Sequence, residues 1–141
     1  MTAYVIDASI AIKWVVEEEG THQALALLPH DLLAPDLLIA ECANILWKKV
    51  RRAELTEAEA MLAVRLLARA NVELVPMRPL MERATELAIS LNHPAYDCVY
   101  LALAEVRDCA FVTADAGFAR KTLAAGMTAE VVVLGAPGWP L

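Results

Sequence analysis

The sequence has 141 residues, of which 59% are hydrophobic and 21% are charged, and its mean hydropathy is +0.48. This composition excludes a disordered chain, and the length suits one domain, so residues 1–141 are expected to form a single domain. Acidic residues interrupt the apolar stretches well short of the roughly 20 residues that a membrane span requires. The formal net charge of −6 argues against general affinity for nucleic acid, which is typical of basic proteins.

The start of the sequence shows no secretory signal, so we expect a cytoplasmic protein. Three cysteines, Cys42, Cys98 and Cys109, form no CxxC pair. We interpret them as reduced, mostly buried thiols rather than as a catalytic or metal-binding set.

Short apolar strands alternate with helices along the chain. Strands are predicted at residues 3–6, 32–34, 72–75, 109–113 and 130–134, and helices at residues 9–16, 21–28, 36–52, 58–70, 79–91, 94–106 and 116–125. Asp36 is expected as the N-cap or a first-turn acid of the third helix, and Thr56 with Glu59 forms a capping box before the fourth. Strands separated by helical crossovers predict a three-layer α/β/α sandwich with a short, mainly parallel central sheet.

Four acidic residues stand in apolar surroundings. Asp7 and Asp115 each follow a predicted strand, Glu41 lies among apolar residues of the third helix, and Asp97 lies in the first turns of a strongly apolar helix. Sites in parallel sheets form at the carboxyl ends of strands. Each acid has a local explanation: Asp7 and Asp115 as helix caps, Asp97 at a helix N-terminus, and Glu41 beside Asn44 or a lysine.

The other explanation is convergence on one site, where a divalent cation keeps the buried carboxylates ionised. Four such acids together favour convergence, and oxygen ligands without His or Cys favour Mg²⁺ or Mn²⁺ over zinc. A carboxylate-held metal activates water for phosphodiester cleavage without a nucleophilic side chain. The histidines lie outside the four acidic segments, and we interpret His93 as a helix cap beside Pro94.

The acidic segments resemble those of the PIN-domain ribonucleases, and in particular the VapC-type toxins of bacterial and archaeal toxin–antitoxin pairs. The matching segments are Val5-Ile-Asp-Ala-Ser9, Ala40-Glu-Cys-Ala-Asn44, Tyr96-Asp-Cys-Val-Tyr-Leu-Ala102 and Val112-Thr-Ala-Asp115. The length and the order of elements match along the whole chain.

This resemblance implies a Mg²⁺-dependent endoribonuclease whose catalytic and metal-binding acids are Asp7, Glu41, Asp97 and Asp115. Asp7 and Asp97 would be the firmest metal ligands, while the other two would act directly or through water. Three further positions match groups that hold carboxylates or substrate phosphate, namely Ser9, Asn44 and Thr113. Ordinary roles, a helix start for Ser9 and a strand position for Thr113, are equally open.

The substrate implied by the resemblance is structured RNA, such as tRNA or rRNA, and the candidate contacts to it are Lys13, Lys48, Arg120 and Lys121. The resemblance also implies a homodimer and a VapB-type antitoxin as the protein partner. This chain shows no DNA-binding segment, so operator binding would fall to the antitoxin. Trp14, Trp47 and Trp139 are candidate contact residues, although core packing is preferred for Trp47.

Two other functions compete with the ribonuclease. One is a catalytically inactive PIN-like binding module that acts through a protein partner. The other is a phosphatase with Asp7 as covalent nucleophile, which is disfavoured because Ser9 stands where such enzymes carry a second aspartate.

Overall fold

A parallel sheet forms the centre of the protein. The computed structural model describes residues 2–137, and within them five strands occur: β1 (Ala3–Ile6), β2 (Asp31–Pro35), β3 (Glu73–Val75), β4 (Ala110–Thr113) and β5 (Val131–Val133). They pair in the order β3-β2-β1-β4-β5, and every pairing is parallel. The central strand, β1, therefore lies beside β4 although the two strands are far apart in the sequence.

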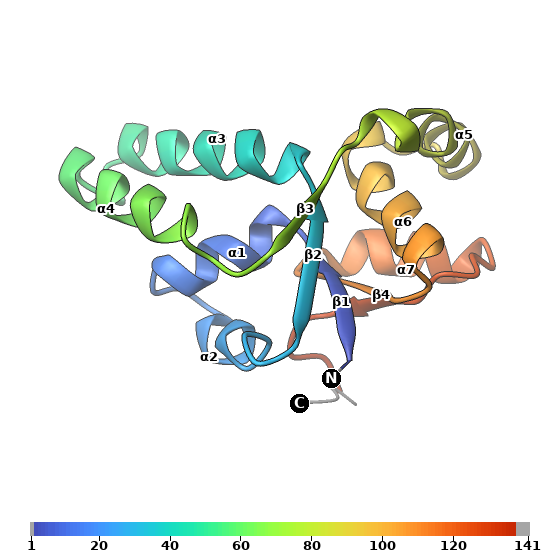
Figure 1. The fold of residues 1–141 in the computed structure, drawn as a ribbon, viewed down its shortest axis with the longest axis horizontal. Helices are drawn as coiled ribbons and strands as arrows, with labels where there is room; N and C mark the ends of the chain where they lie inside the picture. Colours follow the sequence, from blue (N-terminus) through green and yellow to red (C-terminus); the bar gives the residue numbers. More distant parts are fainter. Residues whose placement is uncertain (1, 138–141) are drawn as a thin grey trace.

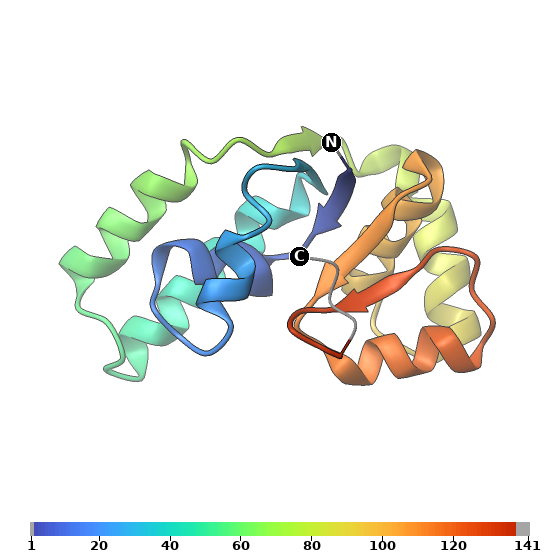
Figure 2. The ribbon, with the colours of Figure 1, turned by 90° about the horizontal axis from the view of Figure 1, so that it is seen from below.

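Helices cover both faces of this sheet. They are α1 (Ala8–Val15), α2 (Thr21–Leu25), α3 (Leu37–Arg51), α4 (Glu57–Leu67), a 3₁₀ turn η1 (Arg78–Leu80), α5 (Met81–Leu91), α6 (Ala95–Arg107) and α7 (Ala116–Ala124). Helices α1–α4 lie on one side of the strands and α5–α7 on the other in both views (Figures 1 and 2). The predicted three-layer sandwich is confirmed, with a wholly parallel sheet.

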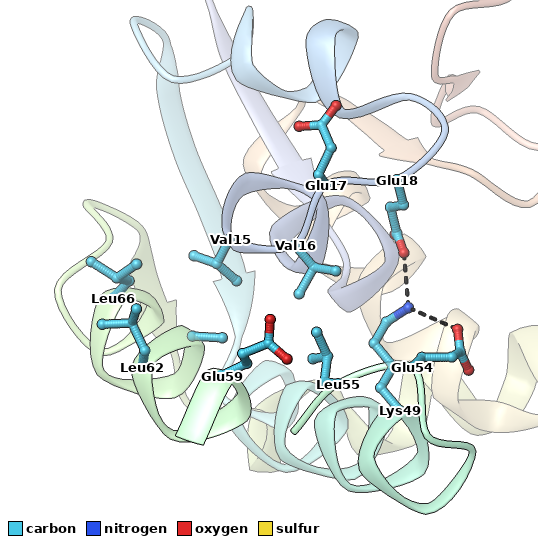
Figure 3. Close-up of a pocket in the computed structure, with 11 residues that line it drawn as sticks. Val15, Val16, Glu17, Glu18, Lys49, Glu54, Leu55, Glu59, Leu62 and Leu66 are labelled. Atoms are coloured by element: carbon cyan, nitrogen blue, oxygen red, sulfur yellow. Dashed lines mark hydrogen bonds and ion pairs between the residues drawn. The ribbon is translucent and has the colours of Figure 1, made fainter. Parts of the chain in front are cut away.

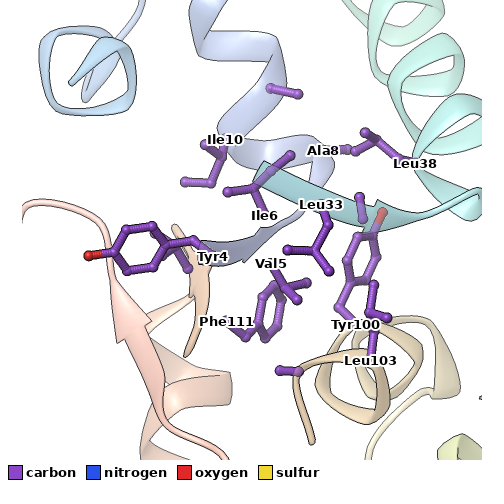
Figure 4. Packing of buried hydrophobic residues seen from close by; sticks show 14 of the residues in the cluster. Tyr4, Val5, Ile6, Ala8, Ile10, Leu33, Leu38, Tyr100, Leu103 and Phe111 are labelled. Atoms are coloured by element: carbon purple, nitrogen blue, oxygen red, sulfur yellow. The ribbon is translucent and has the colours of Figure 1, made fainter. Parts of the chain in front are cut away.

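The core is centred on β1 and β4. Val5, Ile6, Phe111 and Val112 are completely buried, because helices cover both faces of the strands and leave no solvent side for polar residues. Behind them the Tyr100 ring of α6 stacks on Phe111 with centroids 5.6 Å apart, and Figure 4 shows this pair beside Val5 and Leu33. The sheet next to the acidic residues is therefore dry and closely packed.

Every predicted strand and helix occurs, and the differences lie at the ends. The predicted helix at 21–28 ends at Leu25, and Pro79 lies in the 3₁₀ turn η1 that precedes α5. The capping box is confirmed: the Glu59 amide donates to Thr56 Oγ1 at 3.1 Å, and the Thr56 amide donates to the Glu59 carboxylate at 2.9 Å. Asp36 is the N-cap residue of α3, as predicted, but its carboxylate makes no cap hydrogen bond to the helix and accepts the Met77 amide at 3.2 Å instead.

The thiols agree with the expectation from the sequence. Cys42 and Cys98 are buried, Cys109 is half-buried, and all three are free. Burial raises the pKa of Cys42 to about 12 and that of Cys98 to about 11, so neither is a ready nucleophile. Among residues 2–137, no helix combines the length and apolar character needed to traverse a lipid bilayer.

Candidate active site

The acids meet where the order of strands reverses. From β1 the chain adds β2 and β3 on one side, and β4 and β5 on the other. Crevices for ligands open at the carboxyl ends of strands at such a reversal. The register pairs Ile6 with Val112, which places Asp7 directly beside Thr113.

Asp7 is held by donors on both carboxylate oxygens. Ser9 Oγ donates to Oδ1 at 2.5 Å, and Thr113 Oγ1 donates to Oδ2 at 2.6 Å. The Ile10 amide also donates to Oδ1 at 3.3 Å, so Asp7 is the N-cap of α1. Asp7 is thus a helix cap and also a member of the acidic site. Ser9 and Thr113, two of the predicted supporting residues, contact it directly.

Burial governs the protonation of Asp7. The residue is only 7% exposed, and the loss of hydration raises its pKa to about 6 despite the hydroxyl donors, with the negative charge of Asp97 adding to the rise. Within residues 2–137, no cationic side chain lowers this pKa, so no positive charge there balances the Asp7 carboxylate.

Glu41 reaches the same region from α3. Its Oε1 accepts a hydrogen bond of 2.5 Å from the Tyr100 hydroxyl, rather than one from Asn44 or a lysine. Burial raises the pKa of Glu41, the Tyr100 hydrogen bond lowers it, and the charge of Asp97 raises it further. Sequence reasoning missed Tyr100, although its spacing of three residues from Asp97 puts both on one face of α6.

Asp97 lies in the first turn of α6, where a histidine contacts it. His93 Nε2 lies 2.7 Å from Asp97 Oδ2. The N-cap of α6 is Pro94 and not His93, so the interpretation of His93 as a cap is wrong. His93 lies in the loop that precedes Pro94, and its ring is turned toward the acid.

Asp115 caps the helix that follows β4. Its Oδ1 accepts the Phe118 amide at 3.1 Å, and its own amide donates to Thr113 Oγ1 at 3.1 Å. Ser9 Oγ accepts the Ala114 amide at 3.2 Å. The hydroxyls of Ser9 and Thr113 thus bind Asp7 and also tie the start of α1 to the start of α7.

All four acids line one open cavity of about 310 Å³. Its other lining residues include the three predicted supporting positions and one of the predicted cations: Ser9, Asn44, Thr113 and Lys48. Within residues 2–137, no three His, Cys, Asp or Glu side chains are placed to hold one ion together. Mg²⁺ commonly takes one or two carboxylates and completes its shell with water and phosphate, and the all-oxygen donor set fits that mode of binding.

The remaining predicted RNA contacts lie elsewhere. Lys13 Nζ lies 3.2 Å from Glu18 Oε1 and 2.6 Å from the Glu19 carbonyl. Lys121 Nζ donates to the Asn92 carbonyl at 3.0 Å, and Arg120 lines a separate cavity between α7 and β5. Of the four predicted cations, only Lys48 lines the acidic cavity.

A second cavity, of about 480 Å³, lies between the end of α1 and the α3–α4 hairpin (Figure 3). Lys49 Nζ lies there 2.9 Å from Glu18 and 3.7 Å from Glu54, and the apolar lining comes from Val15, Val16, Leu55, Ala63, Leu62 and Leu66. Because none of the four acids lines it, this groove is not the candidate active site.

The tryptophans differ in their surroundings. Trp47 is 53% exposed with the Arg51 guanidinium 5.1 Å from its ring centre, so the prediction of core packing is wrong: it lies on the solvent side of α3. Trp14 is half-buried and donates to the Ala24 carbonyl at 2.8 Å. Trp139 lies outside the described residues.

Known proteins are similar to this chain in fold and in sequence. The sequence model of the PIN domain family matches residues 4–123 of this chain. Ribonuclease VapC9 of Mycobacterium tuberculosis is 35% identical over 111 residues, which cover 79% of this chain and 84% of that protein. The crystal structure of PAE2754 from Pyrobaculum aerophilum is similar at a TM-score of 0.68 and 26% identity, covering 93% of this chain and 90% of that one.

A structure of VapBC2 from Rickettsia felis bound to a DNA fragment from its promoter matches with a TM-score of 0.66 and 13% identity. It covers 92% of this chain and 97% of that one, and shows likeness of fold alone. The extent of the domain match and the identity to VapC9 decide the relationship. The chain belongs to the PIN domain family.

Proposed function

We propose that this protein is a divalent-metal-dependent endoribonuclease and the toxin of a VapBC-type toxin–antitoxin pair. Family membership and the identity to a VapC ribonuclease support this function. The observation that carries it is the cavity in which Asp7, Glu41, Asp97 and Asp115 gather from separate segments of the chain. Four carboxylates around one opening suit metal-assisted hydrolysis of a phosphodiester bond.

In this proposal Asp7 and Asp97 are the main ligands of Mg²⁺ or Mn²⁺, with Glu41 and Asp115 acting directly or through water. A bound ion would supply an activated water and neutralise charge on the scissile phosphate. The chain's own contribution is orientation: Ser9 and Thr113 fix both oxygens of Asp7, and Tyr100 holds one oxygen of Glu41.

The substrate in this proposal is structured RNA, with tRNA and rRNA as the candidates, and the site of action is the cytoplasm. Lys48 lines the acidic cavity seven residues after Glu41 on α3, so its ammonium is the group we assign to a backbone phosphate near the acids. Asn44 lies between the two on the same helix and is assigned to the same task.

The test is cleavage of purified tRNA and rRNA with and without Mg²⁺. Asp7→Asn and Asp97→Asn are expected to abolish cleavage while thermal unfolding shows a folded protein. Asp31→Asn is the matched control, because this exposed acid lies at the amino end of β2, away from the cavity. Cleavage that survives a chelator, or that either active-site variant performs at the parent rate, would refute the proposal.

The proposed partners are a VapB-type antitoxin and a second copy of this chain. The Rickettsia felis structure holds VapBC2 on promoter DNA, and we assign DNA contact in such a complex to the antitoxin. Co-expression with the product of an adjacent small reading frame should relieve growth inhibition, and light scattering should give the mass of a dimer. A chain that bound such a partner but neither a divalent ion nor RNA would instead be the inactive binding module.

A further inference from the structure

A chain of polar contacts leads outward from Asp97 to the far end of α7. His93, in the loop between α5 and α6, places Nε2 2.7 Å from Asp97 Oδ2. Its other ring nitrogen, Nδ1, lies 3.3 Å from Lys121 Nζ. Lys121 is itself fixed by donation to the Asn92 carbonyl at 3.0 Å. Three separate elements thus meet on one imidazole ring.

In the neutral imidazole of His93, the donors and acceptors in this chain fix which nitrogen carries the hydrogen. A lysine ammonium can only donate, so Nδ1 of His93 must be the acceptor. The ring hydrogen then resides on Nε2, which donates to Asp97 Oδ2. Oδ2 thereby accepts one hydrogen bond from His93, while Oδ1 accepts none from that ring and is the more open of the two oxygens to a ligand in the cavity.

Packing restrains the ring as well. The His93 side chain is only 16% exposed, and its ring centre lies 4.7 Å from that of Phe118, a residue of α7 that is 1% exposed. The Phe118 amide also donates to Asp115. One residue of α7 therefore positions two of the four acids, Asp115 through its backbone and Asp97 through His93.

We infer that His93 is a positioning residue for Asp97, with its tautomer set by Lys121, and that this pair orients the carboxylate toward the divalent cation. The inference rests on the metal site of the proposed function. Histidine–carboxylate contacts of this kind beside metal ligands tune affinity by orienting the ligand. The competing explanation is an ion pair that only stabilises the first turn of α6, which would change folding stability and leave metal affinity unaltered.

The first experiment measures Mn²⁺ affinity of the full chain by electron paramagnetic resonance. His93→Phe keeps a ring against Phe118 but has no N–H, and should weaken binding about 10-fold or more. His93→Gln places an amide N–H near the former Nε2 and should restore most of the affinity. Equal Mn²⁺ affinity in the parent and His93→Phe, or failure of Gln to improve on Phe in folded protein, would overturn the inference.

The second experiment locates the hydrogen in the metal-free protein at alkaline pH. Long-range ¹⁵N–¹H correlation spectra should show His93 with hydrogen on Nε2, and Lys121→Met should shift the ring toward a mixture of tautomers, which Lys121→Arg prevents. A parent ring with hydrogen on Nδ1 would contradict the inference. If Asp97→Asn loses Mn²⁺ but His93→Phe does not, only the positioning role fails, whereas a parent that binds no Mn²⁺ removes the proposed function too.

Discussion

Asp7 combines a buried position with a charge that the protein alone does not balance. Two hydroxyls and an amide donate to its carboxylate, yet burial outweighs them and raises the pKa to about 6. Without metal, the proton is therefore retained well above the ordinary range of an aspartate. A cation in the cavity would favour the ionised form, so a proton and a metal compete for this one side chain.

This shift predicts how stability depends on pH in a chelator. The pKa rises from the ordinary value of 3.8 to about 6 on folding, so the native state binds the proton more tightly than the unfolded chain. The contribution is fully present below the ordinary value and is lost as pH rises through about 6, a change of about 3 kcal/mol. Urea unfolding at several pH values should show this loss in the parent and a smaller one in Asp7→Asn; parallel curves would contradict it.

Tyr100→Phe should separate orientation of Glu41 from packing of the core. The ring keeps its stacking on Phe111, while the donor to Glu41 is lost and the pKa of Glu41 rises further. We expect RNA cleavage to fall about 10-fold or more, with a change in unfolding free energy of only about 1 kcal/mol. Single-turnover cleavage and urea unfolding measure the two effects, and an active variant would show that Glu41 needs no such support.

Position along the chain was enough to single out the acids. Asp7 and Asp115 follow apolar strands, and Glu41 and Asp97 interrupt apolar helices, so local pattern alone marked them. The structure brings all four to one cavity, although their catalytic role stays a prediction until cleavage is measured.

Their partners could not be read in the same way. The contacts of Tyr100 with Glu41 and of His93 with Asp97 depend on how α6 is rotated against α3 and α7. The pattern of one sequence does not predict that rotation. Lys13 follows Ser9 by four residues in the sequence, but its amine is bonded to the Glu18 carboxylate and the Glu19 carbonyl in the loop after α1.

At the scale of elements, strand and helix types were predictable because periodicity and capping agree. Strands buried on both faces are uniformly apolar, and the helices carry polar residues on one side only. The predicted ends were less accurate where a turn tightened, as at Pro79, which lies in a 3₁₀ turn. Two helix caps also belong to the candidate site, because Asp7 and Asp115 are each the N-cap of a helix and both line the cavity.

The capping box of α4 gives a prediction confined to its element. Thr56→Ala removes the acceptor of the Glu59 amide and should lower the unfolding free energy by about 1 kcal/mol without changing RNA cleavage. Thr85→Ala is the matched control, because that hydroxyl bonds back to the Met81 carbonyl inside α5 and caps nothing. Thermal unfolding of both variants decides; equal effects would show that the box contributes little.

For the whole molecule, the net charge of −6 repels RNA, and the four acids of the cavity concentrate that charge at the proposed site. Divalent cations bound there would offset it locally, so the acidity that argued against a nucleic-acid partner belongs largely to the proposed site itself. If RNA is the substrate, as proposed, its approach to the acids calls for a nearby positive charge, and among residues 2–137 Lys48 is the cation that lines the cavity.

Lys48→Gln should raise the KM for RNA several-fold and make the salt dependence of binding shallower by about one unit of slope. Arg52→Gln removes the same charge from an exposed position one turn further along, at the end of α3, and should change both quantities less. Cleavage rates and filter binding across a salt series provide the comparison. Equal effects from both variants would show that these cations attract RNA only through their charge, and that Lys48 makes no specific contact at the cavity.

The pairing of β1 with β4 also has a consequence for the newly made chain. Asp7 and the hydroxyl of Thr113 that holds it are 106 residues apart in sequence. A nascent polypeptide exposes the first acid long before the strand that orients it has emerged, and loops of such length close slowly. A fragment that stops before β4 also lacks Asp115, so whatever chemistry the cavity performs begins only after β4 and the start of α7 have been made.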